Sequence, residues 1–182
     1  MSERDLRASR RYATALFSAC SKADKLDVVE RDIAQILELF RSTPIVLKMW
    51  ESPLLPAGRK RDLVTQLFET SIDPLTLGFL RLLVDKRREV ILETVRYELR
   101  QLADRSRHLV RADVVFAIQP TDAEKTALVK SLEARTGDKV EITVSVEPAI
   151  LGGVIVRMQD TILDGSVRGT FEKLREQLLQ EA

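Results

Sequence analysis

The 182-residue sequence has few of the residues that build disulfides, metal sites and membrane spans. It contains a single cysteine, Cys20, so no intramolecular disulfide can form and an oxidising compartment gains no support. Because it also contains a single histidine, His108, the usual zinc sites built from cysteine and histidine cannot be assembled. No apolar run approaches the roughly 20 residues that a membrane-spanning helix needs.

Signals for nucleotide and nucleic-acid binding are also missing. Neither of the glycine-rich phosphate-binding patterns GxxxxGK[ST] and GxGxxG occurs. Gly152-Gly153 stands before an expected strand rather than after one, which is the wrong context for a phosphate loop. The net charge is +1, too small for a strong cationic field, although the N-terminal half is modestly basic. We therefore expect a binding protein without catalytic residues, metal or cofactor.

Residues 1–107 show helical periodicity throughout and predict an all-α bundle of six helices. The first expected helix, residues 5–23, has one apolar stripe and a second stripe of smaller residues beside it. The main stripe consists of Leu6, Ala13, Leu16, Phe17 and Cys20, and the second of Ala8, Tyr12, Ala15 and Ala19. Together they cover more of the helix than packing against one core requires.

The fifth expected helix begins at Asp73-Pro74, where Asp is a good cap and Pro a good first residue. Its leucines, Phe79 and Val84 point almost all round the axis. Two interpretations remain open: either central burial in the bundle explains both wide apolar faces, or part of the surface stays exposed as a groove. Such a groove would take an amphipathic helix from another chain.

From Leu109 onward the period changes to two, which is typical of half-buried strands. Val140 to Val146 is the clearest strand, and the capping box Thr121 to Glu124 starts a helix that ends near Gly137. A hairpin with its turn at Gln159-Asp160 and a terminal amphipathic helix follow. The sequence thus predicts an α+β protein: a bundle over residues 1–107 and a β-α-β-β-β-α domain over residues 108–182.

Three segments resemble one known family. Gly153-Val-Ile-Val-Arg157, followed by Ile162-Leu-Asp-Gly-Ser-Val-Arg-Gly169, is similar to the C-terminal signature of the delta subunit of F-type ATP synthase. The mitochondrial counterpart is the oligomycin-sensitivity-conferring protein. Ala8 to Phe17 resembles the family's opening helix, and Glu51-Ser-Pro-Leu-Leu-Pro56 precedes a basic helix as in the family. The resemblance covers nearly the whole chain.

The resemblance implies a non-catalytic stator subunit that links the catalytic α/β head to the peripheral stalk. In the family, the groove between the first and fifth helices takes the N-terminal helix of an α subunit. The matching positions are Tyr12, Leu16, Phe17, Phe79, Leu80 and Leu83. The C-terminal domain engages the b subunits of the stalk, for which the candidates are Arg157, Arg168 and Leu178.

Other signature residues are expected to serve the fold. Asp164 and Ser166 are interpreted as turn and cap residues. Gly153, Gly165 and Gly169 are interpreted as turn or close-packing positions. The resemblance places the subunit at the cytoplasmic face of a bacterial plasma membrane, or at the stromal face of a thylakoid, held there only through the complex. Two other functions remain open, an unrelated adaptor that captures an amphipathic helix and a nucleic-acid-binding protein.

Overall fold

The computed structural model describes residues 3–158 and 161–172. The chain divides into two compact units, Met1–Ala103 and Asp104–Ala182, which we describe separately. The division falls within the last turn of a helix, slightly before the boundary expected after residue 107. The first unit is helical and the second contains a four-stranded sheet, so the predicted α+β class is confirmed.

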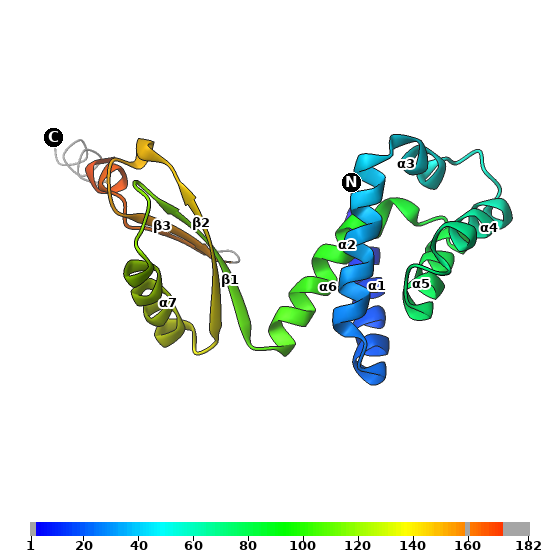
Figure 1. Cartoon of the computed structure of the whole chain (residues 1–182), viewed down its shortest axis with the longest axis horizontal. Coiled ribbons are helices and arrows are strands. Elements are labelled where there is room, and N and C mark those ends of the chain that lie inside the picture. The colour runs from blue at the N-terminus through cyan, green and yellow to red at the C-terminus, as the bar shows by residue number, and fades with distance from the viewer. Residues whose placement is uncertain (1–2, 159–160, 173–182) are drawn as a thin grey trace. The chain divides into compact units, whose positions relative to one another are not determined.

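The first unit consists of helices joined by short connections (Figure 1). In chain order these are α1 (Glu3–Ala23), α2 (Leu26–Ser42), α3 (Pro44–Glu51), α4 (Ala57–Phe68), α5 (Pro74–Asp85), the short 3-10 helix η1 (Glu89–Ile91) and α6 (Leu92–Ser106). One continuous core joins them, with Ile33, Val64 and Leu80 fully buried at its centre.

Capping at the start of α5 follows the sequence expectation. Asp73 accepts a hydrogen bond from the backbone N–H of Leu75 at 2.9 Å, with Pro74 as the first helical residue. Asp32, buried on α2, accepts from the backbone N–H of Asp73 at 2.8 Å and from the Thr76 hydroxyl at 2.9 Å. These bonds fix the position of the N-terminal end of α5 on α2.

The last helix of the first unit, α6, is preceded by the 3-10 turn η1, which helical periodicity does not predict. The Glu89 carboxylate pairs with Lys60 of α4, and both side chains are almost fully buried. The backbone carbonyl of Glu89 accepts a hydrogen bond from the Trp50 indole at 3.0 Å. These tertiary contacts hold the chain in a turn that precedes the regular helix, and local sequence gives no sign of them.

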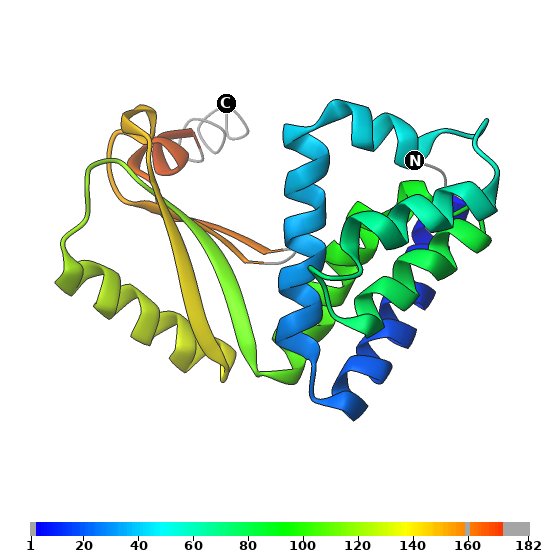
Figure 2. The ribbon, with the colours of Figure 1, turned by 45° about the vertical axis from the view of Figure 1, so that its right-hand side comes forward.

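The second unit is a four-stranded sheet with a helix on one face (Figure 2). Its elements are β1 (Leu109–Phe116), α7 (Asp122–Thr136), β2 (Lys139–Val146), the 3-10 helix η2 (Pro148–Ile150), β3 (Val154–Met158) and β4 (Thr161–Asp164). The strand order is β2-β1-β3-β4, with β1 and β2 parallel and the other two pairs antiparallel. A parallel pair needs a crossover connection, which α7 supplies.

The crossover helix begins and ends as the sequence indicates. Thr121 and Glu124 form a reciprocal capping box, and Gly137 ends α7 in the left-handed conformation at φ 78°. Leu132 of α7 is buried against Val114 and Val140 of the sheet. The alternating apolar residues of β1 and β2 therefore face α7, as expected for half-buried strands.

The C-terminal signature folds back tightly on itself. Gly153 has a φ of +78°, and a Cβ built on it would lie 2.2 Å from the carbonyl oxygen of Gly165. A Cβ on Gly169 would lie 2.6 Å from a carboxylate oxygen of Asp164. Ser166 caps the helical residues that follow, because its hydroxyl accepts from the Gly169 N–H at 2.9 Å. These contacts support the interpretation of the signature as a packing device.

The hairpin turn at Gln159-Asp160 and most of the expected terminal helix lie outside the described residues. Residues 167–172 form the described beginning of that helix.

Candidate functional site

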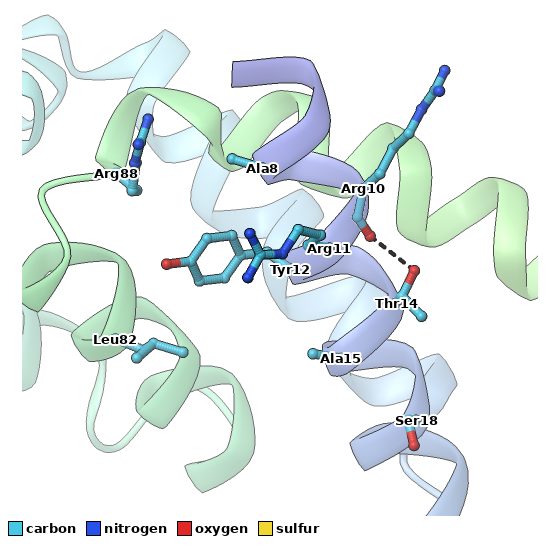
Figure 3. Close-up of a pocket in the computed structure, with 9 residues that line it drawn as sticks. All are labelled: Ala8, Arg10, Arg11, Tyr12, Thr14, Ala15, Ser18, Leu82 and Arg88. Atoms are coloured by element: carbon cyan, nitrogen blue, oxygen red, sulfur yellow. Dashed lines mark hydrogen bonds between the residues drawn. The ribbon is translucent and has the colours of Figure 1, made fainter. Parts of the chain in front are cut away.

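An apolar groove lies between α1 and α5 (Figure 3). Both helices pack against α2 and against η1, which leaves a hollow of about 840 Å³ between them. The residues that line it are Ala8, Arg10, Arg11, Tyr12, Thr14, Ala15, Ser18, Leu82 and Arg88.

The apolar surface of the groove combines one aromatic ring, one leucine and small residues. The Tyr12 ring meets the Phe79 ring edge to face, with centroids 6.4 Å apart. Leu82 projects from α5 with 41% of its surface exposed, and Ala8 and Ala15 lie on the opposite wall. Gly78 lies one turn before Leu82 on α5, is exposed, and has no atom within 4 Å of a Cβ built on it. The small residues leave room for another backbone to approach.

Among the residues that the structure describes, the charged ones that line the groove are all arginines. Arg10 pairs with Glu98 of α6 at 3.2 Å, and Arg88 pairs with Asp5 of α1 at 3.2 Å. The Arg11 side chain is exposed and makes no ion pair or hydrogen bond with any residue that the structure describes. In Figure 3, Arg11 and Tyr12 extend from α1 toward the side of α5, whereas Arg10 extends away.

The predicted α-subunit contacts divide between the groove and the core. Tyr12 lines the groove, and Phe17 is half-buried against the core. The other four side chains are at most 7% exposed, and Leu80 and Leu83 have no exposed surface at all: Leu16, Phe79, Leu80 and Leu83. This burial leaves them too little surface for direct contact with a partner. Phe79 supports the groove through its ring contact with Tyr12, and the other three belong to the core of the bundle.

Three residues that line the groove, Leu82, Ala8 and Ala15, are absent from the contacts predicted from the sequence. The signal for the alanines was present, because Ala8, Tyr12 and Ala15 form the second stripe of the first helix. No comparable signal existed for Leu82, since a helix that is apolar on every side does not reveal which side faces solvent.

Cys20 and His108 belong to the residue types most often used in redox and acid–base chemistry, and neither lies in a catalytic arrangement among the described residues. Cys20 has no exposed surface, and burial raises the pKa of its thiol to about 11. A thiol of this kind is inert at neutral pH. His108 follows α6 with a φ of 51°, is largely exposed, and its Nδ1 lies 3.1 Å from an Asp138 oxygen. The burial of Cys20 agrees with its place in the main apolar stripe of the first helix.

The candidate stalk contacts in the second unit lie on exposed surface where the structure describes them. Arg157 is exposed on β3, and Arg168 donates to Glu172 at 3.0 Å, an interaction that raises the pKa of Arg168. Leu178 lies outside the described residues. Phe171, one turn after Val167, is 63% exposed, and both stand on the described beginning of the terminal helix. The stalk assignments stay predictions.

Residues 3–158 and 161–172 contain neither a candidate membrane-spanning helix nor a candidate metal centre. No helix in these ranges is long and apolar enough to cross a bilayer. Within the same ranges, no three histidine, cysteine, aspartate or glutamate side chains gather closely enough to hold a metal ion.

Comparison with known proteins gives consistent results. The family described as "ATP synthase delta (OSCP) subunit" matches residues 8–178. "ATP synthase subunit delta" of Salinibacter ruber is 34% identical, with 100% of this chain and 96% of the relative covered. The protein of the same name from Syntrophomonas wolfei is 32% identical, with 94% of each chain covered.

A solved structure agrees with the sequence relatives. A chain of the cryo-EM structure of the Toxoplasma gondii mitochondrial ATP synthase hexamer matches with a TM-score of 0.68 and 26% identity. The match covers 94% of this chain and 97% of that chain. The resemblance predicted from three sequence segments is therefore confirmed, and the chain belongs to the ATP synthase delta (OSCP) subunit family.

Proposed function

We propose that this chain is a non-catalytic connector in the stator of an F-type ATP synthase. The first unit binds the α/β catalytic head through the N-terminal helix of an α subunit, which lies in the groove between α1 and α5. The second unit binds the b subunits of the peripheral stalk. The head is thereby prevented from turning with the rotor, so that rotor torque is coupled to ATP synthesis and proton transport.

The apolar groove is the observation that carries this proposal. A helix that docks in a groove contributes side chains at i, i+3, i+4 and i+7 positions, which need an apolar surface with recesses between larger side chains. Tyr12 and Leu82 provide the larger side chains, and Ala8 and Ala15 provide the recesses. The exposed Gly78, one turn before Leu82 on α5, adds no side chain that would obstruct an approaching helix. Burial of apolar surface at about 25 cal/mol per Å² is a suitable source of affinity, reduced by the ordering cost of association.

Exposed apolar and basic side chains in the second unit support stalk binding. Val167 and Phe171 stand on one side of the terminal helix, and the Val167 N–H donates to the Gly152 carbonyl at 3.0 Å. Leu151, adjacent to Gly152, is 71% exposed. These apolar residues offer a surface for an amphipathic helix of a stalk subunit, and Arg157 and Arg168 are the proposed basic contacts of the same unit.

The subunit would work at a membrane through its partners. Its curated relatives include subunits from bacteria, which favours the cytoplasmic face of a bacterial plasma membrane over the stromal face of a thylakoid. Attachment through the α and b subunits accounts for membrane association without nucleic-acid or lipid contacts of its own.

Calorimetric titration tests head binding. The full chain is titrated with a peptide of the N-terminal ~20 residues of the α subunit from the same organism. One-to-one binding with a negative heat-capacity change is expected, because apolar surface is buried. If the folded chain does not bind this peptide, the head-binding role fails and an unrelated helix-capturing adaptor becomes the better account.

A further inference from the structure

We propose that the groove selects a helix that carries a carboxylate beside its apolar stripe, and that Arg11 is the residue that pairs with this carboxylate. This inference rests on the proposed docking of a helix between α1 and α5. It goes further by assigning the chemistry of the occupant and one residue that determines specificity.

The charges in the groove are of one sign. Arg10, Arg11 and Arg88 are its charged lining residues, and no acidic side chain of the described part of the chain lines it. Arg10 and Arg88 each have an acidic partner within the first unit, Glu98 and Asp5. Arg11 has no such partner among the described residues, so its charge is available to an incoming helix.

The position of Arg11 suits a contact at the edge of an apolar interface. It is adjacent to Tyr12, whose ring forms part of the groove surface, and it extends toward the same side (Figure 3). A docked helix would remove water from this region and lower the local dielectric constant, which strengthens an ion pair relative to one in bulk water. A helix with a neutral or basic residue at this place would leave the Arg11 charge partly desolvated and unpaired.

A second hollow in the same unit shows that a one-signed lining is not general for this surface. The hollow between α4 and α5 is lined by Arg61, Asp62, Arg81 and Asp85, together with Thr65 and Gln66. The charges of its two arginines and two aspartates balance. Arg81 donates two hydrogen bonds, from Nε and Nη2, to the Thr65 hydroxyl oxygen at 3.1 and 2.9 Å. Selection for a carboxylate is therefore a property of the α1/α5 groove.

A double-mutant cycle tests the pairing on the full chain. The probes are the α-subunit N-terminal peptide and a version in which every Asp and Glu is replaced by Asn or Gln. Each is titrated into the unchanged chain, into Arg11→Gln and into Arg135→Gln, an exposed position on α7 in the other unit with the same change of charge. Arg10→Gln serves as the matched neighbour, because Arg10 already pairs with Glu98.

The unchanged chain should bind the amide peptide roughly two- to five-fold more weakly than the acidic peptide, as exposed ion pairs allow. This difference should disappear in Arg11→Gln and persist in Arg135→Gln and Arg10→Gln. It should also shrink as salt is raised, because added ions screen the pair.

Two results would overturn the pairing while leaving helix docking intact. One is equal binding of the acidic and amide peptides by the unchanged chain. The other is an acid preference that Arg11→Gln retains in full, which would place the carboxylate elsewhere. If neither peptide binds the unchanged chain, the docking proposal itself fails, and the selection by Arg11 fails with it.

Discussion

The ring of Tyr12 meets the ring of Phe79 edge to face, with centroids 6.4 Å apart and an angle of 68° between the ring planes. This contact crosses from α1 to α5 and joins a groove residue to a core residue. The groove floor is thus part of the packed core and exists before any partner binds. A preformed site spares the partner the cost of ordering the groove, which favours tight binding.

Adjacent leucines on α5 should respond differently to substitution. Leu82 is 41% exposed in the groove, so Leu82→Asp should abolish α-peptide binding and leave thermal stability almost unchanged. Leu83 has no exposed surface, so Leu83→Ala should lower the free energy of unfolding by about 2–5 kcal/mol. Calorimetry and urea unfolding of both variants check this. Normal peptide binding by folded Leu82→Asp would contradict the groove assignment.

Substitutions at Gly78 should separate the stability of the chain from its binding of the α peptide. Gly in the middle of α5 costs about 1 kcal/mol relative to Ala, and nothing lies within 4 Å of an added Cβ. Gly78→Ala should therefore stabilise the chain by up to that amount. Gly78→Leu should fold equally well but weaken α-peptide binding at least ten-fold, because its side chain fills the approach path. Unchanged affinity of Gly78→Leu, measured by the same titration, would place the partner helix away from α5.

Asp73 should make stability depend on pH. The hydrogen bond from Lys25 at 2.8 Å, followed by that from the Leu75 N–H, lowers the pKa of the Asp73 carboxyl. A carboxyl whose pKa is lowered by folding stabilises the protein above its unfolded pKa of about 3.9, and this contribution is lost as pH falls through the folded pKa. The unfolding free energies of the unchanged chain and Asp73→Asn should therefore differ at pH 7, and the difference should shrink as pH falls below about 4 toward the lowered pKa of Asp73.

Urea unfolding at several pH values measures this difference. In a Lys25→Met background the same substitution should lose most of its pH dependence, because the main cause of the lowered pKa is gone. A difference that stays constant down to pH 3 would show that the Lys25 contact does not act on Asp73 in solution.

Two glycines with the same φ provide a matched test of the C-terminal signature. Gly153 and Gly137 both have a φ of 78°, but only at Gly153 would a Cβ collide with backbone, at 2.2 Å from the Gly165 oxygen. Gly137→Ala should cost about 1–2 kcal/mol for the left-handed conformation. Gly153→Ala should cost clearly more and unfold the β3 region, which hydrogen exchange of the β3 amides would detect. Equal protection in the two variants would contradict the packing role of the signature.

Local signals in the sequence were sufficient for most elements of the fold. The Asp73-Pro74 cap, the Thr121–Glu124 capping box and the change from helical to strand period each act over a few residues, so they can be read directly. The 3-10 turn at Glu89 could not be predicted, because it depends on contacts with Lys60 and Trp50 that are distant in sequence.

The sequence predicted the two helices that form the groove and Tyr12 on its surface, but not Leu82. Successive helical residues are rotated by about 100°, so Leu82 and Leu83 face different surroundings. In an amphipathic helix the polar residues mark the side that faces solvent. The sequence of α5 is apolar on every side, so it does not mark which residues are exposed. Packing of α5 against α4, α2 and η1 decides that Leu83 is buried and Leu82 exposed. On α1 the polar face is clearer, and Tyr12 was placed correctly on the groove.

The most direct test of the connector role is a bridging measurement. The full chain is mixed with a purified α/β head and a soluble fragment of the b subunits, and complexes are separated by size-exclusion chromatography. We predict that head and stalk fragment co-elute only when the chain is present, and that Leu82→Asp releases the head while the stalk fragment stays bound. Co-elution of head and stalk without the chain, or undiminished bridging by folded Leu82→Asp, would contradict the account.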